Sequence, residues 1–343
     1  MWLKQKMMSS LKLSMLGLLW VLSFNLIFNK KGHVAMIIVF GSINVDMVMP
    51  VEEFPVPGET ILSADYMTHT GGKGANQAVA AARQDVKVAM VGKVGDDAFG
   101  RRSRHTLKMQ SILASGVAIS ERPTGCAMIC VNAKGENTVV VSSSANLDTT
   151  SDQLPSEILN ENNTVLLDME IEPEQIWDVV ERASERGTRV ILNAAPAGFI
   201  PDNVFEKLDY LILNEIEATQ LADLCKIKEQ GVENLAKAFS KKGRLTCIIT
   251  IGQKGSFAVT EDGACWTSGA LDVDPVDTTG AGDAFCGIFA ASLEKGSDFK
   301  TALHYASVGG SLACLGMGAQ EGVPYSDALK EKLEDLDQPV QLS

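Results

Sequence analysis

The sequence predicts a three-layer α/β fold, in which a doubly wound and mainly parallel sheet lies between two layers of helices. Short apolar segments with strand character alternate with longer segments of helical spacing, and this alternation is typical of right-handed βαβ units. Hydrophobic residues make up 45% of the 343 residues, which is enough for a large core. The length is compatible with two domains, or with one large α/β domain that carries an insert.

The N-terminal half of the predicted fold begins at residue 36. Residues 36–40 are expected to form a buried strand, 74–83 an Ala-rich helix and 86–95 a second apolar strand. Prolines and alternating apolar residues in 45–70 indicate edge strands and turns outside the main sheet. Residues 123–145 are expected to form two further strands joined as a hairpin.

The C-terminal half alternates more regularly between strands and helices. Ligands of such sheets bind beyond the carboxyl ends of the strands, so the residues that follow each strand are the candidates for a site. The residues after 335 are expected to form a frayed tail, 336–343. The expected strands are 164–168, 189–193, 210–214 and 247–251, and the expected helices are 173–186, 215–224, 232–242 and 286–293.

The charge distribution excludes one class of partner. The chain carries a net charge of −13, and residues 36–343 hold 25 basic against 43 acidic residues, a net charge of −18. A body this acidic repels phosphate backbones, so we expect no nucleic-acid partner. The odd number of cysteines, seven, and their scattered positions predict free thiols in a reducing compartment.

The first 35 residues form a hydrophobic extension. Residues 13–28 carry no charge and are flanked by lysines, which is the pattern of a signal-peptide core or a short membrane anchor. Sixteen helical residues span about 24 Å, less than a hydrocarbon layer of about 30 Å. An upstream extension from a doubtful start codon explains the segment equally well. We therefore expect a cytoplasmic protein, with a nuclear location left open, in preference to a membrane-bound or secreted one.

The strongest chemical signal is the segment 277–283, which reads DTTGAGD and precedes an apolar helix. Gly280, Ala281 and Gly282 leave a bare backbone at a helix start, where free N–H groups and the helix dipole attract negative charge. Asp283 lies in the first turn, next to that anion site, and is placed to accept a proton from a hydroxyl. A plain glycine-rich turn is the alternative, but it does not explain this string at a strand end in a βαβ chain.

A second glycine-rich segment, 71–77, reads GGKGANQ and also opens a helix. Its glycines allow a ligand to approach the backbone closely, and Lys73 and Asn76 offer donors for hydroxyls or an anion. The sequence has neither a Walker A loop nor a GxGxxG segment at a strand–helix junction. A P-loop phosphate site and a nicotinamide site therefore lose their main support.

Together the two segments resemble the signature motifs of the ribokinase-like (PfkB) carbohydrate kinases, and GGKGANQAVAAAR resembles their ribokinase subgroup. The resemblance runs from about residue 36 to 330 and adds the segments 41–46, 169–170, 214–217 and 250–255. It implies a kinase domain at 36–335, in which strands of 45–70 and 123–145 form a small β-sheet lid. The sugar site that it implies comprises Asn44, Val45, Asp46, Gly72, Lys73, Gly74, Ala75, Asn76, Glu170 and Asp283.

The resemblance also implies where ATP and two cations bind. Mg²⁺ would bridge the phosphates through water near Asn214 and Glu217, and K⁺ would bind in a loop next to the anion hole. The implied nucleotide site comprises Asn214, Glu217, Thr250, Ile251, Gly252, Gln253, Lys254, Gly255, Gly282 and Ser307. The implied K⁺ ligands are Asp277, Thr279, Ala313, Gly316, Gly318 and Gly322. A serine is usual at the last of these positions, so we expect Gly322→Ser to tighten K⁺ activation.

The activity that the resemblance implies is phosphorylation of D-ribose by ATP at the 5-hydroxyl, which gives ribose 5-phosphate and ADP. Asp283 would act as the general base, with the backbone of Gly280, Ala281 and Gly282 as the anion hole. Kinases for fructose, deoxyribose or adenosine, and a non-catalytic sugar-binding relative, are the alternatives. The resemblance further implies a homodimer formed through the lid.

The sequence departs from the family pattern in four places. The segment 193–197 lacks a usual proline, and Ser307 lies where an Asn or His often borders the adenine. Gln84 and Asp85 replace the Leu-Gly pair that usually ends the first helix, and Asp tolerates a left-handed cap less well than Gly. Thr70 replaces an aromatic residue before the glycines. None of these changes removes a predicted catalytic group, so we expect effects on stability or affinity.

Overall fold

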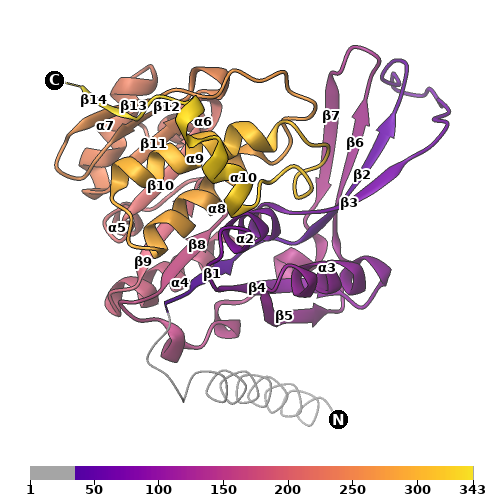
Figure 1. Cartoon of the computed structure of the whole chain (residues 1–343). Coiled ribbons are helices and arrows are strands. Elements are labelled where there is room, and N and C mark those ends of the chain that lie inside the picture. Colours follow the sequence, from indigo (N-terminus) through magenta and orange to yellow (C-terminus); the bar gives the residue numbers. More distant parts are fainter. Residues whose placement is uncertain (1–34, 343) are drawn as a thin grey trace, which may run out of the picture.

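The centre of the computed structural model, which describes residues 35–342, is a ten-stranded sheet between two layers of helices (Figure 1). This arrangement confirms the predicted three-layer, mainly parallel α/β fold. Across the sheet the strands are β14 (Val340–Leu342), β13 (Cys265–Ser268), β12 (Ser256–Val259), β11 (Thr246–Thr250), β10 (Tyr210–Asn214), β9 (Arg189–Asn193), β8 (Thr164–Leu167), β1 (Ile37–Phe40), β4 (Val88–Gly95) and β5 (Leu113–Ser120).

The strands from β11 to β5 run parallel, and the central ones are buried on both faces. Their sequences, such as IIVF in β1 and TVLL in β8, are therefore continuous apolar runs without alternation. The three edge strands β12, β13 and β14 are antiparallel. The expectation of a frayed C-terminal tail is wrong for residues 340–342, because β14 forms backbone hydrogen bonds with β13.

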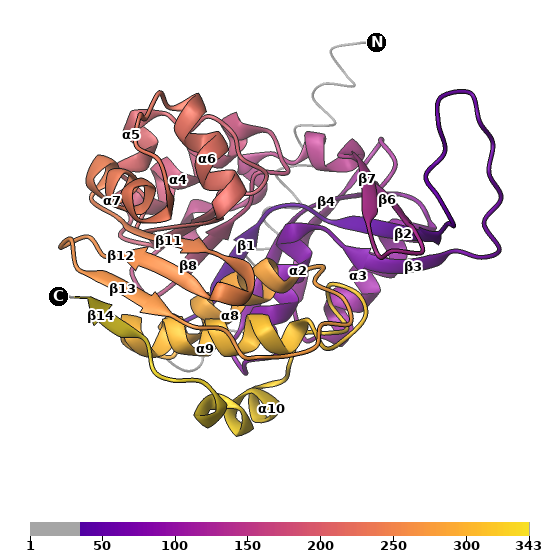
Figure 2. The same cartoon turned by 90° about the horizontal axis from the view of Figure 1, so that it is seen from above.

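Helices cover both faces of the sheet, as Figure 2 shows from above. One face carries a layer that packs through α2 and α8 onto β1, and the other carries the layer from α4 to α7, with a separate hydrophobic cluster under each layer. The α-helices are α2 (Lys73–Ala82), α3 (Ala98–Met109), α4 (Pro173–Glu185), α5 (Asp202–Phe205), α6 (Glu215–Leu224), α7 (Val232–Gly243), α8 (Ala281–Glu294), α9 (Phe299–Ala313) and α10 (Ser326–Glu331). The short 3₁₀ turns are η1 (Ser144–Asp148), η2 (Ser151–Gln153), η3 (Ser156–Ile158), η4 (Gly252–Lys254) and η5 (Leu333–Asp335).

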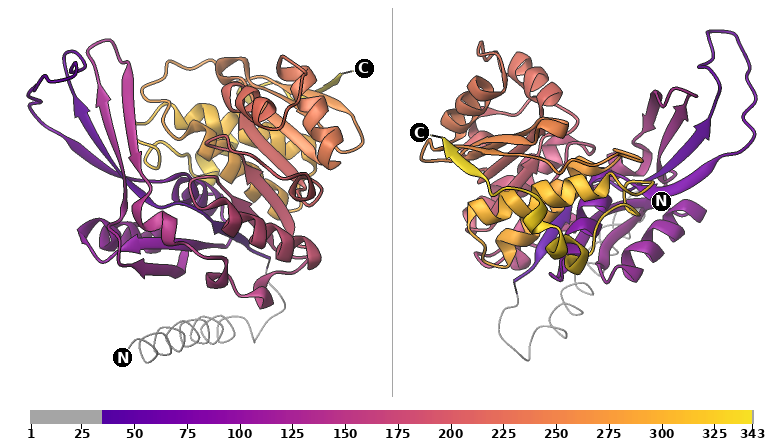
Figure 3. Two further views of the ribbon diagram at one scale, coloured as in Figure 1. Left: turned by 180° about the vertical axis from the view of Figure 1, so that it is seen from behind. Right: turned by 45° about the horizontal axis from the view of Figure 1, so that its top comes forward.

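A second sheet of four strands stands away from this body, at the end opposite β14 (Figure 3). Its strands, in spatial order, are β3 (Met67–Gly71), β2 (Asn44–Pro50), β6 (Gly125–Val131) and β7 (Asn137–Ser142). All four fall within or next to the two regions in which the sequence predicts strands outside the main sheet. β7 is exposed along its whole length.

Helices α2 and α8 carry the two glycine-rich motifs and pack directly against each other on β1. Gly287 allows this approach, because a Cβ at that position would overlap the backbone oxygen of Gln77. The strand before α2 is β3 of the small sheet, whereas a loop of residues 269–280 joins β13 of the main sheet to α8. The packing of α2 against α8 brings the two helix starts together, so that Asn76 contacts Asp283. Helix α8 begins at Ala281, so Asp283 lies in its first turn as predicted, although the apolar pattern alone marked only residues 286–293.

Within residues 35–342, we find no helix that is long and apolar enough to cross a bilayer. The hydrophobic segment 13–28, on which the alternatives of an anchor and a signal rest, lies outside the described residues. The location of the protein stays a prediction.

Candidate active site

Asp283 is the third residue of α8 and lies just behind the glycines of its motif. Gly280 is the N-cap residue, with φ of 76° in the left-handed region that favours glycine. A Cβ on Gly280 would also lie 2.7 Å from the Cβ of Ala319, so the position has no room for a side chain. Asp283 is 7% exposed and lies in the first turn of α8. The N–H groups of this turn have no partner within the helix. The structure thus places the carboxylate of Asp283 beside the glycine-rich start of α8.

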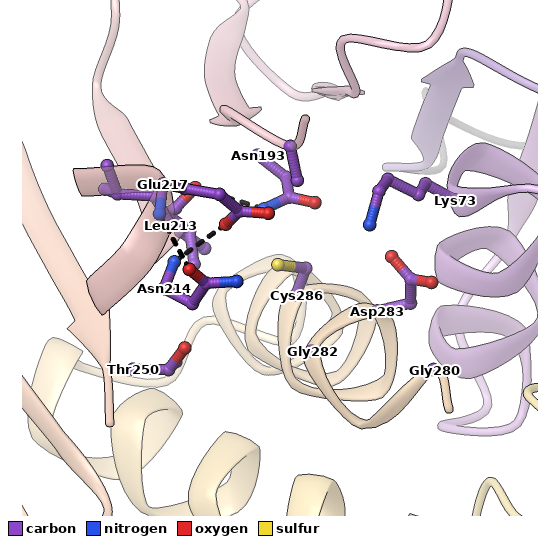
Figure 4. A pocket seen from close by; sticks show the side chains of 12 residues that line it. Lys73, Asn193, Leu213, Asn214, Glu217, Thr250, Gly280, Gly282, Asp283 and Cys286 are labelled. Atoms are coloured by element: carbon purple, nitrogen blue, oxygen red, sulfur yellow. Dashed lines mark hydrogen bonds between the residues drawn. The ribbon is translucent and has the colours of Figure 1, made fainter. Parts of the chain in front are cut away.

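Lys73 faces Asp283 across a pocket of about 160 Å³ (Figure 4). Burial lowers the pKa of Lys73, but the carboxylates of Asp283 and Glu170 raise it more, and the net result is above the ordinary value. Lys73 therefore stays charged at neutral pH, as an anion ligand would require. The pocket is lined by Lys73, Asn193, Ala195, Ile212, Leu213, Asn214, Glu217, Thr250, Gly280, Gly282, Asp283 and Cys286.

Two amide side chains of α2 hold the carboxylate of Asp283. Asn76 donates from Nδ2 to Oδ2 at 3.0 Å, and Gln77 donates from Nε2 to Oδ1 at 3.0 Å. Gln320 in turn donates to Oδ1 of Asn76 at 3.0 Å, and the hydroxyl of Thr70 donates to Oε1 of Gln320 at 2.8 Å. Sequence reasoning singled out Asn76 but missed Gln77, which also contacts Asp283, and Gln320, which contacts Asn76.

The signal that could have found Gln77 is its place next to Asn76 in the first turns of α2. Gln77 also donates to Oδ1 of Asn193 at 3.0 Å, and Asn193 is the last residue of β9. Gln320 offers a weaker signal, as a polar residue within a glycine-rich segment. Its contact with Thr70 spans 250 positions, and no local pattern reports such a pairing.

The predicted sugar-binding residues gather where β2 meets α2. Asn44 donates from Nδ2 to Oε2 of Glu170 at 3.3 Å, and the backbone N–H of Lys73 donates to the same oxygen at 3.4 Å. Burial, together with the nearby charges of Glu170 and Asp283, raises the pKa of Asp46 to about 6. Gly71 is required opposite Asp46, because a Cβ there would overlap the carboxylate.

A second pocket of about 380 Å³ adjoins Asp46 and lies between the small sheet and the segments 275–279 and 317–319. Its walls combine apolar side chains, such as Val48 and Ile129, with Asp46 and His69. The small sheet is therefore placed over the sugar-side residues. This position is the one expected of the predicted lid.

Asp168 is a buried carboxylate that no sequence motif indicated. Its Oδ2 accepts the backbone N–H of Ser42 at 2.9 Å, and its Oδ1 accepts the N–H of Glu170 at 2.8 Å. Burial is the main cause that raises the pKa of Asp168, and the charge of Glu170 adds to it. Gly41 and Gly74 leave room for this carboxylate, since a Cβ on either would collide with it. Asp168 thereby joins the end of β1 to the segment that carries Glu170.

Asn214 and Glu217 form a reciprocal cap at the start of α6. The N–H of Asn214 donates to Oε2 of Glu217 at 2.8 Å, and the N–H of Glu217 donates to Oδ1 of Asn214 at 2.8 Å. Burial raises the pKa of Glu217, whose side chain reaches into the pocket (Figure 4). Within residues 35–342, no three or more His, Cys, Asp or Glu side chains form a cluster able to hold a metal.

The other predicted nucleotide residues are more dispersed. Thr250 lines the pocket at the end of β11, and Ile251, Gly252, Gln253, Lys254 and Gly255 continue from it through η4. Ser307 is buried in α9, and its hydroxyl has no hydrogen-bond partner among residues 35–342. It is not among the residues that line the pocket.

The predicted K⁺ ligands surround one loop beside α8. Asp277 accepts the N–H of Thr279 at 2.9 Å and that of Gly318 at 2.9 Å. Burial raises the pKa of Asp277, but these hydrogen bonds lower it more, so it lies below the ordinary value. The carbonyl oxygens of Ala313 and Gly316 converge on the space where a Cβ of Gly322 would lie.

This geometry contradicts the expectation that Gly322→Ser would simply tighten K⁺ activation. A Cβ on Gly322 would overlap the oxygen of Ala313, which is a backbone atom and cannot rotate away. The loop closes around glycine, so a serine requires the backbone of residues 313–316 to move.

Known proteins that resemble this chain belong to the predicted family. The model of the pfkB family carbohydrate kinases matches residues 34–325. A ribokinase of Bacillus subtilis (strain 168) is 36% identical over 304 residues, which cover 87% of this chain and 99% of the relative. A deoxyribokinase of Salmonella typhi is 32% identical over 301 residues, which cover 87% and 98%. A solved structure of Arabidopsis thaliana ribokinase, complexed with ribose and ATP, aligns with a TM-score of 0.79 at 28% identity and covers 88% of this chain and 99% of its own.

Proposed function

Because the chain belongs to the pfkB family of carbohydrate kinases and is a kinase of the ribokinase type, we propose that it transfers the γ-phosphoryl group of ATP to the 5-hydroxyl of D-ribose, with Asp283 as general base. The observation that carries the proposal is the place of Asp283. Its carboxylate is buried beside the N-terminus of α8, bound by two amide donors and opposite the charged amine of Lys73.

Each carboxylate oxygen of Asp283 accepts one amide hydrogen and keeps a lone pair for the substrate hydroxyl. As the hydroxyl oxygen attacks the γ-phosphorus, its proton passes to Asp283, and the bond from phosphorus to the β-phosphate oxygen breaks to release ADP. The N–H groups of Gly280, Ala281 and Gly282 and the amine of Lys73 stabilise the charge of the transferring group. A positioned base of this kind contributes ~10²–10⁴-fold to the rate.

The sugar would be held on the side of β2. Asp46 and Asn44 offer a carboxylate and an amide to vicinal hydroxyls, and Glu170 lies beside Asn44. The backbone of Gly72 to Asn76 and the main chain at Val45 complete the proposed site. The ribokinase of Bacillus subtilis and the ribose-bound structure of the Arabidopsis enzyme support ribose as the acceptor.

ATP is proposed to lie along the other side of the pocket, over Asn214, Glu217, Thr250 to Gly255 and Gly282, and next to α9 at Ser307. The donor set fits Mg²⁺, because Glu217 presents one partly buried carboxylate toward the space proposed for the phosphates, and Mg²⁺ commonly combines one carboxylate with phosphates and water. When bound, the ion would neutralise charge on the phosphates.

K⁺ is proposed at the loop of Asp277, Thr279, Ala313, Gly316, Gly318 and Gly322. The converging carbonyl oxygens at Gly322, together with an ionised Asp277, are the hard oxygen donors that suit a large monovalent cation. When bound, the cation would stabilise the loop that precedes α8.

Three of the alternatives are kinases that differ from a ribokinase in their acceptor, and a fourth is not a kinase. The relative named deoxyribokinase is nearly as similar as the ribokinases, and ribose differs from 2-deoxyribose only by one hydroxyl. Fructose and adenosine remain acceptors to test, and a non-catalytic sugar-binding protein is the alternative from another class. A purely binding protein has no need for a base next to an anion hole.

A homodimer through the small sheet is proposed from its exposed apolar side chains. Val139, Val140 and Val141 of β7 and Met128 of β6 are all exposed. Val140 and its cross-strand neighbour Met128 share one face of the small sheet, and Val139 and Val141 lie on the other. Exposed apolar side chains on a sheet face favour burial against another surface. Sedimentation of the wild-type chain and of Val140→Glu tests this: the proposal requires a dimer that the variant weakens.

The acceptor assay tests the proposed function. The purified protein is incubated with ATP, Mg²⁺ and K⁺ and with ribose, 2-deoxyribose, fructose or adenosine, and ADP release is measured; ³¹P NMR then locates the phosphate. We expect the highest kcat/KM with ribose and a product phosphorylated at the 5-hydroxyl. A preference for another acceptor would replace ribose, whereas sugar binding without any ADP release would favour the non-catalytic alternative.

A further inference from the structure

The structure shows a chain of buried amides that runs from the small sheet to the carboxylate of Asp283. Thr70 of β3, Gln320 of the loop after α9, and Asn76 of α2 follow one another by hydrogen bonds of 2.8–3.0 Å. All three side chains are buried, with Gln320 only 4% exposed. These contacts join three segments that are far apart in sequence.

Each hydrogen bond of this buried series can have only one assignment of donor and acceptor. An ionised Asp283 only accepts hydrogen bonds, so Asn76 must present its NH₂ group to Oδ2. The carbonyl oxygen of Asn76 then faces Gln320, which must present its own NH₂ group. The remaining oxygen of Gln320 needs a donor, and the hydroxyl of Thr70 supplies one.

We propose that Gln320 is a positioning residue, which orients the amide of Asn76 so that it donates to the catalytic base and keeps the carboxylate of Asp283 aimed at the substrate hydroxyl. This inference rests on the proposed role of Asp283. Asn76 alone could rotate its amide by half a turn and present an oxygen to the carboxylate. The NH₂ group of Gln320 opposes that rotation, because it would then face the NH₂ group of Asn76.

The loop that carries Gln320 is built to hold it in place. Arg83, at the end of α2, donates to the backbone oxygens of Gln320 and Val323, each at 2.6 Å. Gln84 donates to the oxygen of Pro324 at 3.0 Å. Helix α2 thus carries Asn76 at its start and anchors the loop of Gln320 at its end, so the two amides share one rigid support. The substitution of Thr70 for an aromatic residue provides the hydroxyl that ends the chain.

The test compares Gln320→Met, Gln320→Glu and a matched control, Gln84→Met. Gln84 is also 4% exposed and also binds this loop, but it has no contact with Asn76 among the described hydrogen bonds. Methionine removes the donor, and we expect kcat to fall by about tenfold. Glutamate has the shape of glutamine but only accepts, so it turns the Asn76 amide around, and we expect a loss of about 10²-fold. The KM values for sugar and ATP should change less than kcat.

The relative losses of kcat in these variants distinguish a positioning role of Gln320 from a role in packing alone. A purely structural role predicts that Gln320→Met and Gln84→Met lower the melting temperature and kcat alike, and that result would overturn the proposal. Wild-type kcat in Gln320→Glu would also overturn it. Thr70→Val and Thr70→Ser provide a second measurement if a Gln320 variant fails to fold: loss of the hydroxyl should lower kcat by about 3–10-fold, and serine should restore it. Equal kcat in the valine and serine variants would contradict a role for the hydrogen bonds that run from Thr70 to Asn76.

Asp283→Asn keeps this test separate from that of the proposed function. If ADP release by the wild type does not depend on Asp283, the proposed base is wrong. If it depends on Asp283 but not on Gln320 or Thr70, the base stands and the positioning role of Gln320 is refuted.

Discussion

Replacing Asp46 by Asn should make the protein more stable at neutral pH and less able to bind its sugar. The carboxylate is largely buried and lies near the charges of Glu170 and Asp283, and these causes, burial first, raise its pKa to about 6. Asparagine has nearly the same shape but carries no charge. The variant should therefore lack the electrostatic destabilisation that the charged, buried carboxylate of the binding site causes in the wild type.

The sign and size follow from proton linkage. Below about pH 4 the carboxyl is protonated in both states, and the wild type bears no cost. Between the ordinary pKa of 3.8 and about 6, the unfolded chain loses its proton first, so the free energy of unfolding falls as pH rises. Above pH 6 the full cost is present. Two pKa units correspond to about 3 kcal/mol, and solvent screening at the open side of the site reduces this to about 1–2 kcal/mol.

Urea unfolding at pH 4, 5, 6 and 8 measures this difference, and calorimetric titration measures sugar binding. Asp97 offers a control of opposite sign: burial raises its pKa, but hydrogen bonds from Thr124 and Gly100 lower it more, to below the ordinary value. Asp97→Asn should therefore be less stable than the wild type at pH 8. A gain in Asp46→Asn that does not change between pH 4 and 8 would refute the reasoning, because a charge effect must follow the titration.

Three further substitutions have expected outcomes. Asp283→Asn should lower kcat by ~10²–10⁴-fold while sugar and ATP still bind by calorimetry, and near-normal turnover would exclude the base. Asp85 has φ of 60°, so Asp85→Gly should raise the free energy of unfolding by about 0.5–1 kcal/mol in urea titrations; an unchanged value would mean that the strain is absent. Gly322→Ser should lower the melting temperature and weaken activation by K⁺ relative to Na⁺, because a Cβ overlaps the oxygen of Ala313; tighter activation would show that the loop adapts.

Much of the fold was predictable because strand and helix signals are local. The apolar runs of β1, β8 and β10 and the helical spacing of α2 and α4 report burial over a few residues, and their order implies a parallel sheet. The antiparallel strands β12 to β14 were not predicted, since short strands at the end of a sheet resemble other polar and apolar segments. The pairing of β14 depends on an edge that β13 leaves free, and that edge exists only in the folded sheet.

From the sequence alone we could predict that Asp283 follows a glycine-rich turn at a helix start and that Lys73 and Asn76 open a second helix. Both statements concern residues within one turn of each other, where backbone geometry is local. The folded structure was needed to show that these two turns face one pocket, that Gln77 contacts Asp283 and that Gln320 contacts Asn76. The physical reason is that a buried amide acquires its role from the partner across the core. The identity of that partner depends on which helices pack on the same face of the sheet. The sequence around either residue carries no information about it.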